Sequence, residues 1–183
     1  MWRLGVGRTF QVAASFGSMS VRENVQMVLL SQAKRLLDPW RAATQQHRGE
    51  ALALLDQVGM RDQADHAASL LSYGDLKRLE LAMALASAPR LLLMDEPAAG
   101  MGPKERDQLM ALAARLAAQS AIGVLFTEHS MDVVFRYASR ILVMARGRLI
   151  AQGDPTSVRD NPEVQAVYLG TGATFRAHAA MNQ

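Results

Sequence analysis

The sequence contains no cysteine, few aromatic residues and no long apolar run. The absence of cysteine excludes disulfide bonds, thiolate catalysis and cysteine-ligated metal sites. The apolar runs, of which Ile122 to Phe126 is typical, are far shorter than the roughly 18 residues that a membrane-spanning helix needs. The N-terminus has no charged start followed by an apolar stretch, so no signal peptide is predicted. We therefore expect any membrane role to depend on a partner protein.

The charge and composition are ordinary for a globular protein. The 183 residues are 50% hydrophobic and 20% charged, which predicts one domain, complete or partial, with a substantial core. The net charge is +3 and the sequence pI about 9.7, but no run of five or six basic residues occurs. We therefore predict no nucleic-acid partner.

Helical and strand patterns alternate along the chain. Residues 1–20 are rich in Gly and Ser and predict a loop. The alternation between residues 75 and 145 indicates βαβ units, and so an α/β fold with a parallel sheet. Helices are predicted at 21–36, 51–58, 72–87, 103–121, 131–138 and 162–169. Strands are predicted at 91–94, 122–127, 141–144 and 149–151, and the last two are joined by a turn at Arg146 to Arg148.

Two carboxylates, Asp95 and Glu96, directly follow the apolar run Leu91 to Met94. Ligands of parallel sheets bind beyond the carboxyl ends of the strands, which is where these residues fall. Asp95 is placed to hold Mg²⁺, usually through water, and Glu96 to orient or deprotonate an attacking water. The alternative is a strand that simply ends in two acidic residues before Pro97.

The turn Ser72-Tyr73-Gly74-Asp75 precedes a predicted helix. Gly74 allows close backbone approach, Ser72 offers a hydroxyl, and the start of the helix favours an anion. The alternative is an ordinary helix N-cap, which is the more common use of a serine three residues before an acidic residue.

Two further polar residues are candidates. His129 follows the next strand, one βαβ step of roughly thirty residues after Asp95, so it is expected beside Glu96. There it would hydrogen-bond a γ-phosphate and the attacking water, although a surface histidine near a helix start is an alternative. Gln11, in the N-terminal loop, has an amide that can reach both a metal and a water, and it is also a common loop residue.

Taken together, these residues resemble the ABC-transporter ATPase family in order and spacing. Leu71 to Asp75 is similar to the LSGGQ signature, and Arg90 to Glu96 to the Walker B strand with its catalytic glutamate. His129 matches the switch histidine and Gln11 the Q-loop glutamine. The resemblance covers about residues 4–170. It implies a partial ATPase domain over residues 1–170, with a P-loop NTPase-like parallel sheet, a helical signature subdomain at about 21–88 and a flexible tail at 171–183.

A narrower resemblance is to the branched-chain amino-acid uptake subfamily. It rests on three segments, Gly7 to Gln11, Glu96 to Met101 and Asn161 to Gly170. The resemblance implies ATP and Mg²⁺ as cofactors, a second ATPase subunit and transmembrane permease subunits as partners, and a periplasmic solute-binding protein acting indirectly. It also implies a peripheral position on the cytoplasmic face of the membrane. The roles implied are catalytic for Glu96, His129 and Gln11, metal binding for Asp95 and Gln11, and nucleotide binding for Ser72, Tyr73, Gly74 and Asp75.

The sequence departs from the family pattern chiefly at the phosphate-binding P-loop, G-x-x-x-x-G-K-[ST], which is absent. The run Gly5 to Thr9 has Arg in place of the lysine and lacks the earlier glycine. The family's first strands and its adenine-stacking aromatic residue are also missing. Asp75 stands where the signature usually has Gln, and Gly102 where many relatives have Asp or Asn.

Several functions therefore stay open. An intact form would hydrolyse ATP and drive a membrane partner. A truncated chain would instead complete a partner's ATP site in trans, or would be an inactive fragment. A DNA-repair type of ABC ATPase is disfavoured, because only about sixty residues without heptads separate Gln11 from the signature. We also expect an exposed sheet edge where the first strands would pair, and aggregation of the isolated chain as a result.

Overall fold

The computed structural model describes residues 5–8, 15–32 and 47–169. The chain divides into two compact units, Met1–His129 and Ser130–Gln183, and each is described by itself. The expectation of one partial domain over residues 1–170 stays a prediction. The predicted tail, 171–183, lies outside the described residues.

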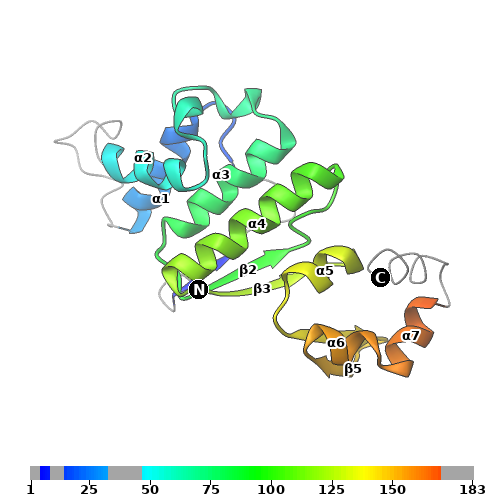
Figure 1. Ribbon diagram of the computed structural model, residues 1–183. Helices are drawn as coiled ribbons and strands as arrows, with labels where there is room; N and C mark the ends of the chain where they lie inside the picture. The colour runs from blue at the N-terminus through cyan, green and yellow to red at the C-terminus, as the bar shows by residue number, and fades with distance from the viewer. Residues whose placement is uncertain (1–4, 9–14, 33–46, 170–183) are drawn as a thin grey trace. The chain divides into compact units, whose positions relative to one another are not determined.

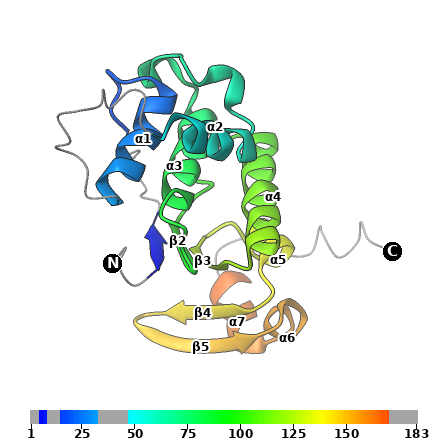
Figure 2. The ribbon, with the colours of Figure 1, turned by 90° about the vertical axis from the view of Figure 1, so that its left-hand side faces the viewer.

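The first unit contains a parallel sheet of three strands in the order β1-β2-β3. These are β1 (Val6–Arg8), β2 (Leu91–Asp95) and β3 (Gly123–Thr127), seen in Figure 2. Asp95, at the end of β2, pairs with Thr127, at the end of β3. The parallel sheet confirms the predicted α/β class, and its register brings the two strand ends to one edge.

Strand β1 corrects the prediction that residues 1–20 form a loop. It is only three residues long and includes Gly7, so its sequence carries no strand pattern. Its backbone nevertheless pairs in parallel with the first residues of β2. A side chain at Gly7 would lie 3.2 Å from both the Ala84 carbonyl oxygen and the Pro89 ring, so close packing also favours glycine there.

Four helices complete the first unit: α1 (Val21–Gln32), α2 (Arg48–Gln57), α3 (Tyr73–Leu85) and α4 (Pro103–Ser120). Helices α3 and α4 pack side by side next to β2 and β3 (Figure 1), while α1 and α2 pack against each other and against α3. Their apolar faces meet in one core, which includes Val21, Val25, Leu55, Leu79, Leu81, Leu92, Met94 and Leu112. None of the helices in the described part of the chain combines the length and the hydropathy of a membrane-spanning segment.

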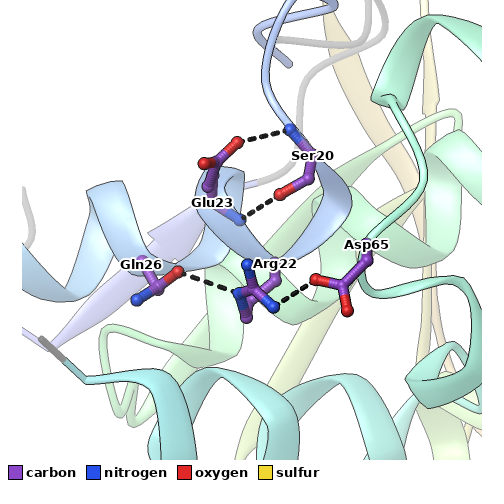
Figure 3. Close-up of polar contacts among 5 residues, drawn as sticks. All are labelled: Ser20, Arg22, Glu23, Gln26 and Asp65. Atoms are coloured by element: carbon purple, nitrogen blue, oxygen red, sulfur yellow. Dashed lines mark hydrogen bonds and ion pairs between the residues drawn. The ribbon is translucent and has the colours of Figure 1, made fainter. Parts of the chain in front are cut away.

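Helix α1 begins with a reciprocal capping box, shown in Figure 3. The Glu23 N–H donates to the Ser20 hydroxyl at 3.2 Å, and the Ser20 N–H donates to the Glu23 carboxylate at 2.8 Å. Arg22 pairs with Asp65, and its Nε donates to Gln26 Oε1 at 3.3 Å. The box satisfies N–H groups that a helix start otherwise leaves open, and the ion pair ties that start to the segment before the Ser72 turn.

Helix α3 carries a buried ion pair one turn after its start. Lys77 Nζ lies 3.0 Å from Glu80 Oε2, and the two side chains are only 4% and 5% exposed. The Lys77 ammonium also lies 5.6 Å from the centre of the Tyr73 ring, within cation–π range. The pair therefore places opposite charges inside the helical layer of the first unit.

Strands β2 and β3 differ in how they are covered. Leu92 and Met94 of β2 are buried and its other residues half-buried, as expected for a strand covered on both faces. In β3, Val124 and Phe126 are half-buried, but Leu125 is 54% exposed. One face of β3, the last strand of this sheet as described, is therefore open, although the apolar run at 122–126 is as continuous as that of β2.

The second unit is a β-hairpin covered by short helices. Its elements are α5 (Met131–Tyr137), β4 (Ile141–Ala145), β5 (Arg148–Gly153), α6 (Pro155–Arg159) and α7 (Pro162–Leu169). Arg146 and Gly147 both have positive φ, 48° and 76°, as a type I′ two-residue hairpin turn requires. The unit's core consists of Ile141, Val143, Val158 and Val164.

Two sequence expectations fail in the second unit. The turn predicted at Arg146 to Arg148 is confirmed, but the strand predicted at 141–144 as part of the parallel sheet instead pairs antiparallel with β5. An apolar run of this length fits a parallel or an antiparallel strand, and the strand with which it pairs determines which of the two forms. Helix α6 was not predicted, although Asp154 caps it and Pro155 opens it, both typical signals of a helix start.

Candidate functional site

Asp95 and Glu96 lie where β2 ends, next to the end of β3. The Thr127 hydroxyl donates to Asp95 Oδ1 at 2.7 Å. The Glu96 N–H donates to both the hydroxyl and the carbonyl oxygen of Thr127, each at 3.1 Å. The neighbouring strand therefore holds both acidic residues at the sheet edge where ligands of parallel sheets bind.

Glu96 has an unusual backbone conformation, with φ of 43°. The left-handed region is unfavourable for residues other than Gly, Asn and Asp, and such residues cluster at functional sites. The chain leaves the strand direction at this residue, and its half-buried carboxylate, 37% exposed, lies near the end of β3. The strained backbone is an observation that favours a functional role over a simple strand end.

His129 lies beside Glu96, as the sequence predicts. Its Nδ1 is 3.9 Å from Glu96 Oε1, which is ion-pair range for a protonated ring but too long for a hydrogen bond. The imidazole is 75% exposed. The structure thus brings Asp95, Glu96 and His129 together, with the histidine side chain open to a ligand at this edge.

The Ser72 turn forms a second group, at the start of α3. Ser72 is the N-cap: its hydroxyl accepts from the Asp75 N–H at 3.2 Å and donates to Asp75 Oδ2 at 2.9 Å. The predicted helix cap is confirmed. The Asp75 carboxylate turns back onto Ser72, so its negative charge stays at the positive end of the helix dipole.

The same turn borders α4 and the loop after Glu96. Ser72, Gly74, Asp75 and Arg78 line a small polar hollow together with Glu105 and Gln108. The Tyr73 ring packs over Gly100, where a side chain would lie 3.7 Å from Cε1, and Gly100 has φ of 76°. The turn and the loop that follows Glu96 are therefore neighbours, joined by an aromatic ring and a glycine.

The predicted metal role can be tested for fit. No group of three or more Asp, Glu or His side chains that could hold a metal occurs in the part of the chain that the structure describes. Mg²⁺ needs no such cage, because it keeps several waters and takes one or two carboxylates plus phosphate oxygens. Asp95 fits that donor pattern. Gln11, the other predicted metal residue, lies outside the described residues.

Two residues in contact with this site were not given roles from the sequence. They are Thr127, already described, and Glu128, whose Oε1 accepts from the Ala98 N–H at 3.0 Å. A polar pair after an apolar strand is a usable signal, but only the cross-strand register shows what such residues contact.

Sequence comparison relates the chain to known proteins at both ends. The family profile described as "ABC transporter" matches residues 1–99, more than half of the chain. A second, described as "Branched-chain amino acid ATP-binding cassette transporter", matches residues 148–174. The chain is 37% identical over 175 residues to the high-affinity branched-chain amino acid transport ATP-binding protein LivG of Escherichia coli, covering 92% of this chain and 69% of LivG. It is 36% identical over 178 residues to BraF of Pseudomonas aeruginosa, with the same coverage.

Solved structures show the same likeness. The ADP conformation of MJ1267, an ATP-binding cassette of an ABC transporter, superposes with a TM-score of 0.76 at 27% identity, covering 92% of this chain and 70% of that one. The cbiO1 protein of Clostridium perfringens, part of the ABC transporter complex cbiONQ, gives a TM-score of 0.74 at 27% identity, covering 99% and 68%.

Proposed function

Because this chain belongs to the ABC transporter family of ATP-binding proteins, we propose that it is the ATPase subunit of an importer for branched-chain or related amino acids. Members of this family are ATPases, and the similar proteins LivG and BraF carry branched-chain amino acid transport in their names. The observation that supports catalysis most directly is the cluster at the ends of β2 and β3, where His129 lies 3.9 Å from Glu96 beside Asp95.

We assign the cluster residues distinct roles. Asp95 would supply one carboxylate oxygen to Mg²⁺, and that ion would neutralise charge on the phosphates. Glu96 would orient the attacking water and accept its proton, while His129 would donate a hydrogen bond to the γ-phosphate. Gln11 would contact the metal and the water. These groups act by position and electrostatics, which dominate in phosphoryl transfer.

The Ser72 turn would serve a different ATP molecule. In this family two ATPase domains pair head to tail, and the signature turn of one closes over ATP held by the P-loop of the other. Ser72, Tyr73, Gly74 and Asp75 would then complete a partner's site. The N–H groups at the start of α3 are suited to phosphate oxygens, and the Ser72 hydroxyl would donate to one by rotating away from Asp75 Oδ2.

The partners follow from the same proposal. A second ATPase subunit would pair with the chain, and permease subunits would hold it at the cytoplasmic face of the membrane. A periplasmic solute-binding protein would act only through those permease subunits. The binding protein and the permease would determine which amino acid is transported, because the residues discussed here would contact ATP and not the transported solute.

The test uses the chain and a longer form. The 183-residue chain has no P-loop sequence, so we expect it to bind Mg-ATP poorly in equilibrium dialysis. In a form extended upstream to include a P-loop, Glu96→Gln should abolish turnover while ATP stays bound. Unchanged hydrolysis in that variant would refute the role of Glu96. Tight Mg-dependent ATP binding by the 183-residue chain would refute the proposal that these residues carry the catalytic groups and the signature turn but not the phosphate-binding groups.

A second candidate is a non-catalytic chain that only completes a partner's ATP site. The turn at Ser72 is the part of the chain that this role requires, because the rest of that ATP site would belong to the partner. Translating the gene upstream of Met1 separates the two. An open frame with a P-loop supports the enzyme, whereas an in-frame stop codon supports the trans-acting module or an inactive fragment.

A further inference from the structure

The end of β3 supports the Asp95–Glu96 pair through one hydroxyl. The Thr127 hydroxyl donates a hydrogen bond to Asp95 Oδ1 at 2.7 Å and accepts one from the Glu96 N–H at 3.1 Å. A single side chain therefore contacts the carboxylate of one acidic residue and the backbone of the next. The strand register places Thr127 opposite Asp95, so these contacts follow from β pairing.

The backbone of Glu96 depends on such support. Its φ of 43° is a conformation that side-chain-bearing residues rarely adopt and that persists only when the surroundings enforce it. The Glu96 N–H donates to the carbonyl oxygen of Thr127 as well as to its hydroxyl. The strained residue is thus held at its N–H by the neighbouring strand.

Glu128 holds the other side of Glu96. Its carboxylate accepts from the N–H of Ala98, two residues after Glu96, at 3.0 Å. Ala98 is buried, so its N–H needs a partner within the protein. Thr127 and Glu128 together hold the chain immediately before and after the carboxylate that would activate water.

We infer that Thr127 and Glu128 are positioning residues. They would hold the Asp95 carboxylate, which is proposed to bind the metal ion, and they would fix the orientation of Glu96. The inference rests on the proposed function only in the roles given to Asp95 and Glu96. Valine at position 127 would keep the shape of threonine but neither donate nor accept a hydrogen bond. Serine would keep the hydroxyl. Glutamine at position 128 would keep an acceptor for the Ala98 N–H, and alanine would remove it.

The test uses the full 183-residue chain, labelled with ¹⁵N, and two measurements by NMR. The first is amide hydrogen exchange at Glu96 and Ala98. We expect Glu128→Ala to speed exchange at Ala98 by about fivefold for the loss of one hydrogen bond. Thr127→Val should speed exchange at Glu96 by a smaller factor, about twofold, because the Glu96 N–H keeps the Thr127 carbonyl oxygen as an acceptor. Thr127→Ser and Glu128→Gln should stay close to the wild type. Amides of α2, away from this edge, serve as the internal control for global destabilisation.

The second measurement is a titration with Mn²⁺, whose paramagnetism broadens nearby amide signals. We expect saturable broadening at Asp95 and Glu96 in the wild type, its loss in Asp95→Asn, and a Mn²⁺ affinity about fivefold lower in Thr127→Val, with recovery in Thr127→Ser. If Thr127 only stabilised the fold, Thr127→Val would lower the midpoint of urea unfolding but would leave the Mn²⁺ affinity equal to that of Thr127→Ser.

The outcomes separate the inference from the function on which it rests. If Asp95→Asn leaves the broadening unchanged, the metal role of Asp95 fails. If the wild type shows no broadening, the carboxylates do not hold the ion without phosphate oxygens. In both cases the exchange rates still decide whether Thr127 and Glu128 hold the loop. If Asp95→Asn removes the broadening while Thr127→Val matches the wild type in both measurements, the inference is wrong and the proposed function stands.

Discussion

The starts of helices α1 and α3 share one sequence pattern and use it differently. In both, a serine N-cap precedes an acidic residue by three positions, as Ser20 and Glu23 or as Ser72 and Asp75. In both, the acidic residue's N–H donates to the serine hydroxyl at 3.2 Å. At α1 the longer Glu23 side chain reaches the Ser20 N–H, whereas at α3 the shorter Asp75 takes the Ser72 hydroxyl proton.

The charges beside the two helix starts also differ. Arg22 pairs with Asp65, and the aspartate is 70% exposed. Lys77 and Glu80 of α3 pair with both side chains buried. A pair open to solvent on one side, such as Arg22 and Asp65 with side chains 11% and 70% exposed, contributes about 0–1 kcal/mol, whereas removing one member of a buried pair costs about 3–5 kcal/mol. The start of α1 is thus stabilised mainly by its capping box (Figure 3). The first turns of α3 are stabilised by the buried pair of Lys77 and Glu80.

The difference teaches that a capping pattern does not by itself identify a binding site. The α1 box is closed by its own two residues. The α3 turn instead lines a polar hollow, with Glu105 and Gln108 on the facing helix. A functional role for Ser72 therefore rests on the residues around it and on the family's signature turn. The following predictions test whether the two helix starts differ in stability and in function.

The largest effect is expected at the buried pair. Lys77→Met leaves the Glu80 carboxylate buried without its ammonium, which should lower the free energy of unfolding by about 3–5 kcal/mol. The double variant Lys77→Met/Glu80→Leu should recover most of that loss. Urea unfolding measures both. A double variant as unstable as the single one would show that the pair is not the cause.

The next effect concerns function rather than stability. Ser72→Ala should weaken ATP-dependent association with an intact ATPase subunit of this family by about tenfold or more, because a hydrogen bond to a charged phosphate is lost. Sedimentation with and without Mg-ATP measures it. The matched control is Ser20→Ala, which removes the same atom from the same kind of cap. Equal losses in both variants would reject the functional distinction between the turns.

A smaller effect is expected on the stability of the α1 start. Ser20→Ala removes the hydroxyl that accepts from the Glu23 N–H, and should cost about 1 kcal/mol. Urea unfolding monitored by circular dichroism checks this value. Ser18→Ala, two residues earlier on an exposed turn, is the control. A cost indistinguishable from that control would show that the capping box contributes nothing measurable.

The smallest effect is a pH dependence at Glu23. Hydrogen bonds from the Ser20 backbone and side chain, with the nearby Arg22 charge, hold the pKa of Glu23 below its ordinary 4.5. A lowered pKa means that the ionised carboxylate stabilises the fold at neutral pH, and that this contribution disappears as the pH falls through the lowered value. Glu23→Gln should therefore destabilise the chain more at pH 7 than near pH 3. Glu163→Gln, measured alongside, controls for the loss of a charge.

The sequence predicted the parallel sheet, the cap at Ser72 and the meeting of Glu96 with His129. These features are local or follow from βαβ geometry, which brings consecutive strand ends to one edge. The predicted roles of Gln11, Asp95, Glu96 and His129 stay predictions, and Gln11 lies outside the described residues.

One cause of the failures is pairing between distant segments. Strand β1 forms because β2 offers hydrogen bonds to three residues with no strand pattern of their own. The run at 141–144 fails for a local reason, because it pairs across a two-residue turn with β5 and not with the parallel sheet. Thr127 and Glu128 acquire roles only once register places them opposite Asp95 and the loop after it. Helix α6 is different, because its Asp154 cap and Pro155 were visible in the sequence.

The left-handed backbone of Glu96 has a consequence for how this position can change. A glycine there would relax a conformation that costs about 1–3 kcal/mol, so the fold alone favours losing the carboxylate. A chain selected only for thermal stability would drift toward glycine or asparagine at this site. Under the role proposed for Glu96, its carboxylate would contribute to activity what its backbone conformation costs in stability.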